Sequence, residues 1–207
     1  MTATSHYRSN LRDLFFNLFE FNDIGNRTLG RGPFKNLDVA TTKELLVQLE
    51  KLASNELAAS FAAADRQGVT LGSDGVVRLP KELRASLDAY HDREYHLLEM
   101  PEHLGGMNAP PSLNWAGYEL LAGSNATAGF YVTTQFMLRI IDKLATPEQK
   151  ARFLPAALEK RWNCTMVLTE PDAGSDVGAG KSKARHIADD EWHIEGVKRF
   201  ITGGDSD

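Results

Sequence analysis

The chain has 207 residues, of which 42% are apolar and 25% are charged, a composition typical of one or two small globular domains rather than of a disordered chain. Its formal net charge of −5 argues against a general nucleic-acid binder, because such domains carry a clustered basic excess. The single cysteine, Cys164, excludes an internal disulfide and a four-cysteine zinc site.

Residues 1–36 predict an extension that docks on the rest of the protein. Leu11, Leu14 and Leu18 recur at helical spacing, and a glycine-rich stretch follows. A helix this short is unstable alone, and its polar face lacks the basic array of a membrane-surface helix. The segment also lacks the long apolar run of a secretory signal, and the chain lacks the run of about 18 apolar residues that a membrane span needs. We therefore expect a cytoplasmic protein with no membrane span.

A long helix is predicted after this extension. Thr41-x-x-Glu44 is a capping box that predicts its start, and Gly68 predicts its end. Its apolar face contains Leu45, Leu49, Leu52 and Leu57. Ser73-Asp74-Gly75 then predicts a turn between two short extended pieces.

Three helices are predicted in the middle of the chain. Pro80 favours the first turn of a helix, whose buried stripe comprises Leu83, Leu87 and Tyr90. A loop rich in glycine and proline covers residues 100–111. Beyond it, helices are predicted over roughly 112–126 and 127–144.

The last predicted helix has a clear start signal. In Thr146-Pro147-Glu148-Gln149, threonine is the cap, proline takes the first position and glutamine the third. The helix should end near Lys160, and we expect Pro155 to bend or shorten it.

The residue pattern changes after Trp162. Strands are predicted over 164–169, 181–187 and 192–201, with Asp189-Asp190 as the turn between the last two. Three strands are too few to close a sheet with two buried faces. The predicted fold class is therefore mainly α, with an N-terminal helical domain followed by the first strands of a truncated middle β domain. The expected domains are 1–36, an N-terminal extension; 37–162, the helical domain; and 163–207, the incomplete β domain.

Metal and hydrolase chemistry find little support in the sequence. His91 and His96 are five residues apart, which does not place both on one helical face, and no Cys/His spacing fits zinc. Residues 174–178 lack the Gly-x-Ser-x-Gly spacing of a nucleophile elbow. Gly180-Lys181-Ser182 approaches a phosphate-binding loop, but Ser175 stands where that loop needs glycine, and a helix should follow the lysine. A P-loop nucleotide binder is therefore a remote alternative.

Residues 164–180 are the most informative segment. An apolar stretch leads into Asp172–Asp176, a turn whose backbone amides can converge on an anion, and Ser175 adds a hydroxyl donor. The two aspartates oppose a bare anion, so a tight loop between two strands explains the same residues. The residues alone leave both interpretations open.

Four ordered motifs resemble those of the FAD-dependent acyl-CoA dehydrogenases. Residues Met166–Asp176 and Ile194–Gly203 are similar to that family's flavin-binding signatures and have the family's separation. Upstream, Met100–Gly106 and Ala145–Pro155 resemble a loop and the start of the last helix in its N-terminal domain. Four motifs in order are far more specific than any one alone. The resemblance covers roughly residues 40–207.

This resemblance implies an N-terminal helical domain, a middle β domain that holds FAD, and a C-terminal helical bundle, with residues 1–36 similar to the extension of longer bacterial members. The cofactor-binding residues that it implies are Met166, Leu168, Thr169, Gly174, Ser175, Phe200, Ile201 and Thr202. Ser175 is also implied to approach the thioester substrate. Two residues depart from the family: Phe200 stands where many members have tryptophan, which loses an indole donor, and Asp172 where glycine is common.

The resemblance implies that the parent protein converts acyl-CoA thioesters to 2-enoyl-CoA in fatty-acid β-oxidation. It also implies electron-transfer flavoprotein as the electron acceptor and a homo-oligomeric state. The family's base is a glutamate of its C-terminal part, so we expect this chain to hold no catalytic residue and to be inactive alone. Glu170 and Glu195 belong to the signature segments and are not that base. The alternatives are a flavoprotein relative without this activity and a helical interaction module.

Overall fold

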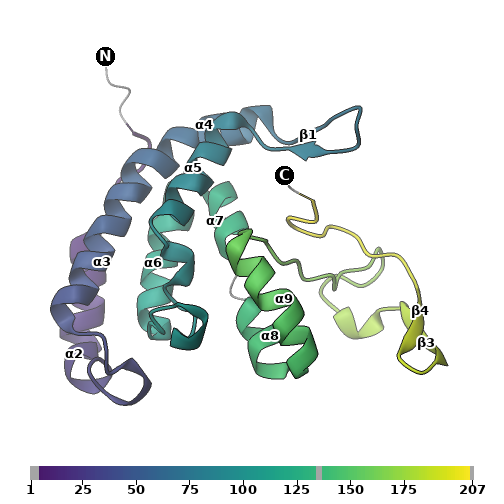
Figure 1. The fold of residues 1–207 in the computed structure, drawn as a ribbon. Coiled ribbons are helices and arrows are strands. Elements are labelled where there is room, and N and C mark those ends of the chain that lie inside the picture. The colour runs from purple at the N-terminus through teal and green to yellow at the C-terminus, as the bar shows by residue number, and fades with distance from the viewer. Residues whose placement is uncertain (1–4, 134–136, 206–207) are drawn as a thin grey trace. The chain divides into compact units, whose positions relative to one another are not determined.

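Helices dominate the computed structural model, which describes residues 5–133 and 137–205 (Figure 1). The helices are α1 (Leu11–Phe15), α2 (Ile24–Arg27), α3 (Val39–Leu52), α4 (Ala58–Gln67), α5 (Lys81–Asp92), α6 (Pro111–Ser124), α7 (Ala126–Thr133), α8 (Leu138–Leu144) and α9 (Pro147–Glu159). The strands are β1 (Thr70–Leu71), β2 (Val77–Arg78), β3 (Lys183–Ala188) and β4 (Glu191–Glu195). The predicted mainly helical class is confirmed. The described residues form two compact units: a helical unit that ends at Asn163, and a C-terminal unit, Cys164–Asp205.

The N-terminal segment packs on the helical unit. Leu14 of α1 and Leu18 of the following π-helical turn are buried in the same core as Leu46 of α3. The Ser9 hydroxyl also donates a hydrogen bond of 2.8 Å to the Glu50 carboxylate on α3. Burial of these leucines removes their apolar surface from water, which offsets the weak intrinsic stability of so short a helix. The predicted docking on protein is confirmed.

The N-cap of helix α3 lies three residues before the predicted one. Asp38 is its N-cap, and the Asp38 carboxylate accepts a hydrogen bond of 2.7 Å from the Thr41 backbone N–H. Thr41 therefore lies inside the first turn, and its assignment as the cap is wrong. A π-helical turn, Ala53–Leu57, continues α3 into α4. Gly68, with φ of 61°, ends α4 as predicted, because glycine adopts this backbone conformation without steric cost.

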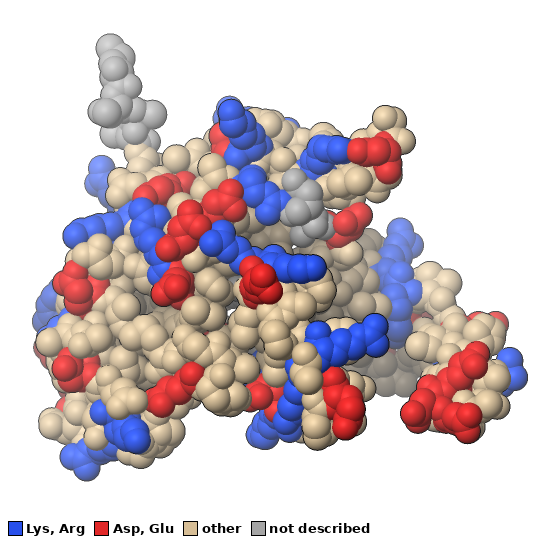
Figure 2. Space-filling view, in the orientation of Figure 1, with Lys and Arg blue, Asp and Glu red and all other residues tan. Residues whose placement is uncertain are grey.

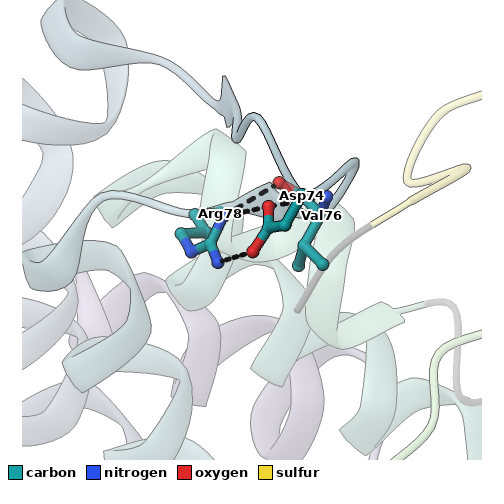
Figure 3. Close-up of polar contacts among 3 residues, drawn as sticks. All are labelled: Asp74, Val76 and Arg78. Carbon is teal, nitrogen blue, oxygen red and sulfur yellow. Dashed lines mark hydrogen bonds and ion pairs between the residues drawn. The ribbon is translucent and has the colours of Figure 1, made fainter.

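The predicted turn at residues 73–75 joins β1 to β2, which pair antiparallel. Figure 3 shows the Arg78 guanidinium against the Asp74 carboxylate, with hydrogen bonds of 2.5 and 3.0 Å. The same carboxylate accepts a bond of 3.2 Å from the Val76 backbone N–H. These hydrogen bonds, from Arg78 first and then Val76, lower the pKa of Asp74 to about 2. This carboxylate thus adds to the backbone bonds that close the turn, from the Gly72 N–H to the Val76 carbonyl at 2.9 Å and from the Gly75 N–H to the Gly72 carbonyl at 3.0 Å.

A buried polar network centred on Asn125 joins four helices. The Asn125 side-chain amide donates to the Leu57 carbonyl at 3.2 Å and to the Ser60 hydroxyl at 2.8 Å. Its oxygen accepts from the Ala128 backbone N–H at 3.1 Å, at the start of α7. The Ser86 hydroxyl of α5 donates to Ser60 at 2.8 Å. Because buried polar groups need partners, this network fixes the junction of α6 and α7 against α4 and α5.

The stretch predicted as a helix over 127–144 contains α7 and α8 among the described residues. Helix α7 ends at Thr133 and α8 begins at Leu138, and residues 134–136 lie outside the described residues. Both described parts of the predicted stretch are thus helical, and its predicted continuity rests on residues outside the described ranges. The preceding helix is close to its predicted bounds, since α6 covers Pro111–Ser124.

Helix α9 begins with the predicted capping signal. The Thr146 hydroxyl accepts from the Gln149 backbone N–H at 3.3 Å, and the Gln149 side chain accepts from the Thr146 backbone N–H at 3.0 Å. The helix continues through Pro155 to Glu159. The helix ends beside Lys160 as predicted, and the expected shortening at Pro155 is wrong. The capping box holds the first turn, and the Lys160 and Trp162 backbone N–H groups donate to the Ala156 and Ala157 carbonyls of the last turn at 2.9 Å.

The surface of the described residues carries mixed charge. On the face drawn in Figure 2, lysine and arginine side chains are interspersed with aspartate and glutamate. No helix within the described ranges has both the length and the apolarity to cross a bilayer.

Candidate functional site

The C-terminal unit contains all the residues predicted to bind a cofactor. β3 pairs antiparallel with β4, and Asp189, with φ of 44°, forms the predicted turn between them. The strand predicted at 164–169 is wrong: within the described residues this segment has no strand beside it. β4 ends at Glu195 instead of at residue 201. Its partner strand β3 begins at Lys183, which pairs with Glu195, so no residue of β3 is available to pair beyond that point.

Glu170 organises this unit from a buried position. Its side chain is exposed by only 7%, and its carboxylate accepts hydrogen bonds from three donors. These are the Lys181 backbone N–H at 2.5 Å, the Ser182 backbone N–H at 3.0 Å and the Lys198 ammonium at 2.9 Å. Hydrogen bonds from Ser182, Lys181 and Lys198 lower the pKa of Glu170 to about 2. The carboxylate is therefore ionised and fully engaged at neutral pH.

The structure brings the two predicted signature segments together. The Arg199 backbone N–H donates to the Thr169 carbonyl at 3.0 Å, and the Lys198 ammonium donates to the Leu168 carbonyl at 3.0 Å. Residues 168–169 therefore lie against residues 198–199. Most of the side chains predicted to hold the cofactor project into solvent beside this junction: Met166 is 63% exposed and Phe200 is 75% exposed. Leu168 and Thr202 are exposed, and Thr169 and Ile201 are half-buried.

A tight turn follows the first segment. Glu170 and Ala173 exchange two backbone hydrogen bonds of 3.1 Å, which close the turn over Pro171 and Asp172. Gly174 and Ser175 lie exposed on its exit, and a Cβ built on Gly174 meets no atom within 4 Å. The small residue at 174 is thus not required by contacts inside the protein. Convergence of Ser175 and Thr202 on one ligand stays a prediction.

The chemistry of these side chains fits a flat ring with one apolar and one polar edge. Exposed apolar groups at Met166, Leu168 and Phe200 offer a contact surface, and the hydroxyls of Thr169 and Thr202 offer hydrogen bonds. Exposed apolar clusters on a small unit are typical of surfaces that a ligand or another part of the protein covers. An isoalloxazine ring has this combination of edges.

The geometry contradicts the phosphate-binding-loop alternative. Such a loop needs a helix after its lysine, but Lys181 and Ser182 lead into β3. Their backbone N–H groups donate to the Glu170 carboxylate instead of facing a phosphate site. Across the described ranges, no three His, Cys, Asp or Glu side chains gather as metal ligands.

The helical unit contains a cavity that sequence reasoning missed. Its volume is about 390 Å³, and its apolar and aromatic wall includes Leu49, Tyr90, Tyr95, Trp115, Tyr118 and Val132. Polar groups also line it: the Glu99 carboxylate accepts from the Arg139 guanidinium at 3.2 Å, and burial raises the pKa of Glu99. Burial, His91 and Arg161 lower the pKa of His96 to about 4. The wall residues come from several separate elements, so no local motif signals the cavity.

Comparison with known proteins gives a consistent result. The family described as acyl-CoA dehydrogenase, N-terminal domain, matches residues 40–161. The chain is 42% identical over 203 residues to the broad-specificity linear acyl-CoA dehydrogenase FadE5 of Mycobacterium tuberculosis, covering 98% of this chain and 33% of that protein. It is 27% identical over 175 residues to 3-methylmercaptopropionyl-CoA dehydrogenase of Ruegeria pomeroyi, covering 84% of this chain and 30% of that protein. The chain thus spans about a third of the length of these curated relatives.

A solved structure shares the fold. The structure titled as the electron transferring flavoprotein of Acidaminococcus fermentans superposes with a TM-score of 0.57 at 21% identity, covering 77% of this chain and 40% of that chain. At this identity the likeness concerns the fold alone.

Proposed function

The chain belongs to the acyl-CoA dehydrogenase family, and from this premise we propose that it forms part of an FAD-dependent enzyme that oxidises acyl-CoA thioesters to 2-enoyl-CoA. The observation that carries the proposal is the junction of the two signature segments. Bonds from Lys198 to the Leu168 carbonyl and from Arg199 to the Thr169 carbonyl place them side by side. Exposed apolar side chains and hydroxyls flank that junction, in the combination that a flavin ring needs.

The proposed flavin-binding residues divide by chemistry. Met166, Leu168, Phe200 and Ile201 supply apolar contacts, while the hydroxyls of Thr169, Ser175 and Thr202 supply hydrogen bonds, and Gly174 leaves room for close approach of the ligand. When bound, FAD supplies the hydride acceptor of the reaction. The protein's own part is to orient the ring, exclude water from one of its faces, and position the thioester near Ser175.

Neither signature glutamate is suited to remove the α-proton. A general base needs a pKa near the working pH and a free lone pair. The pKa of Glu170 is lowered to about 2, and its carboxylate is engaged by three donors. Glu195 lies exposed at the end of β4. We propose that a different carboxylate of the whole protein is the base.

Three further parts of the proposal concern the whole protein. We propose electron-transfer flavoprotein as its electron acceptor, a homo-oligomeric state and a cytoplasmic location. We also propose the division into residues 1–36, 37–162 and 163–207 as extension, helical domain and incomplete β domain. The names of the relatives support only the proposed electron acceptor, and only because they are dehydrogenases of acyl-CoA substrates.

The test compares the 207-residue chain with the protein produced from the complete reading frame. Each is mixed with FAD, acyl-CoA substrates of several chain lengths and an artificial electron acceptor, and enoyl-CoA is measured. We expect steady formation of enoyl-CoA by the whole protein and none by the 207-residue chain, because neither signature glutamate is suited as the base and most of the described side chains proposed to hold the flavin are exposed. A whole protein that binds FAD but leaves every acyl-CoA unchanged would favour a flavoprotein relative without dehydrogenase activity.

A further inference from the structure

The buried Glu170 carboxylate lies in a unit whose residues are mostly exposed to solvent. Among the described residues of the C-terminal unit, Glu170 and Ala173 are the side chains classed as buried. A buried carboxylate is costly unless it is paired and hydrogen-bonded. Here the Lys198 ammonium and two backbone N–H groups satisfy it, so the arrangement is built around this one charge.

The same lysine reaches two points on the first signature segment. The Lys198 ammonium lies 2.9 Å from the Glu170 carboxylate and 3.0 Å from the Leu168 carbonyl oxygen. Between these contacts, the Arg199 N–H donates to the Thr169 carbonyl at 3.0 Å. Residues 168–170 are thus joined by hydrogen bonds to residues 198–199, about thirty positions later in the chain. Within the described residues, no β-ladder aligns these segments, so these contacts set their register.

Two glycines allow the close packing that this arrangement needs. A Cβ on Gly180 would lie 3.2 Å from a Glu170 carboxylate oxygen. A Cβ on Gly196, whose φ is 155°, would lie 2.1 Å from the Ser182 hydroxyl. A contact that short cannot exist, so a larger residue at 196 would push apart the chain segments that donate to Glu170.

The side chains proposed to hold the flavin have little packing of their own. Leu168 is 46% exposed and Phe200 is 75% exposed, so their positions depend on the backbone that carries them. That backbone is attached at residues 168–170 and 198–199. We propose that Glu170 and Lys198 are positioning residues that hold the two flavin-contacting segments in register without touching the flavin themselves. This inference rests on the proposed function.

The test uses two variants of the whole, flavin-loaded protein. Glu170→Gln keeps the shape but removes the charge, and Lys198→Met removes both lysine contacts. The matched control is Glu191→Gln, which removes the charge of an exposed side chain at the start of β4, in the same unit but outside both signature segments. Lys198→Arg serves as the conservative rescue, because it keeps the positive charge.

Hydrogen exchange and flavin spectra are the two readouts. In Lys198→Met, we expect the Arg199 amide to exchange about tenfold faster, while amides of α3 exchange as in the wild type. The visible flavin band should shift, and kcat should fall while KM changes little. Glu170→Gln should show the same changes to a smaller extent, Lys198→Arg should recover most of the wild-type values, and Glu191→Gln should match the wild type.

The outcomes separate this inference from the proposed function. A wild-type protein that binds no flavin refutes the proposed function and the positioning role together. Bound flavin with unchanged Arg199 exchange in both variants refutes the register-setting contacts alone. Faster exchange with an unchanged flavin spectrum and kcat refutes the positioning role and leaves a purely structural one. If Lys198→Met does not fold, Glu170→Gln and Lys198→Arg carry the same comparison.

Discussion

At the scale of single residues, Asn125 shows how one buried amide holds several helices. It is completely buried and makes three hydrogen bonds, to Leu57, Ser60 and Ala128. Asn125→Ala removes all three bonds, takes away the side-chain acceptor of the Ala128 N–H and creates a cavity, so we expect the free energy of unfolding to fall by about 2–4 kcal/mol. Urea unfolding of the 207-residue chain measures it. The exposed Asn55→Ala should cost less than about 1 kcal/mol, and equal effects of the two substitutions would contradict the role of the network.

His96 makes the stability of the helical unit depend on pH. Its folded pKa is about 4, against an ordinary value of 6.5. Below pH 6.5 the unfolded chain takes up a proton that folded His96 refuses until about pH 4, so the free energy of unfolding falls over this window as pH is lowered. We expect His96→Gln to lose less stability than the wild type between pH 7 and pH 4.5 in urea titrations. The exposed His193→Gln should retain the wild-type difference, and an identical loss in His96→Gln would disprove the assignment.

At the scale of elements, the start of α9 can be compared directly with that of α3. Thr146 caps α9 through its hydroxyl, whereas Thr41 lies in the first turn of α3 and Asp38 is the cap. Thr146→Ala should therefore lower the free energy of unfolding by about 1 kcal/mol, and Thr41→Ala by less than about half of that. Thermal unfolding of both variants tests this. A larger effect at Thr41 would restore the sequence-based assignment of the capping box.

Local sequence signals predicted most of the helices but not all of their ends. The apolar stripe of α5, the hairpin turn at Asp74 and the cap of α9 depend on neighbours within a few residues, so they were predictable. The start of α3 was not, because aspartate and threonine both cap helices and stand three residues apart. The strand predicted over 164–169 failed for another reason: apolar β-forming residues become a strand only beside a second strand, and no sequence pattern supplies one.

The candidate site was predicted as a set of residues, but its organisation was not. The resemblance to a family identified the residues on either side of the junction, from Met166 to Thr202. The pairing of Glu170 with Lys198 was missed, because 28 positions separate them and only the folded backbone brings them together. One signal could have indicated this ion pair: a glutamate followed by proline at a turn in the first signature, together with a lysine in the second. The cavity beside His96 has no such signal.

At the scale of the whole molecule, the two units differ greatly in their cores. A cluster of buried apolar residues fills the helical unit, whereas Ala173 is the buried apolar residue described in the C-terminal unit. We expect brief trypsin digestion of the 207-residue chain to cut first at the exposed basic residues between Lys181 and Arg199, because local opening is easiest there. Mass spectrometry should find a helical fragment that ends at or beyond Lys160. Initial cuts within α3–α7 would contradict this order of stability.

The docking of the N-terminal segment bears on how this protein should be trimmed for laboratory use. The family match begins at residue 40, a natural place to start a shortened gene. Yet Leu14, Leu18, Ile24 and Leu37 all lie in the shared core. A protein that starts at residue 40 would expose to water the apolar core residues that these side chains cover. We expect such a protein to aggregate in the expression host. Shortened genes should begin upstream of Tyr7, and affinity tags are better attached there through a flexible spacer.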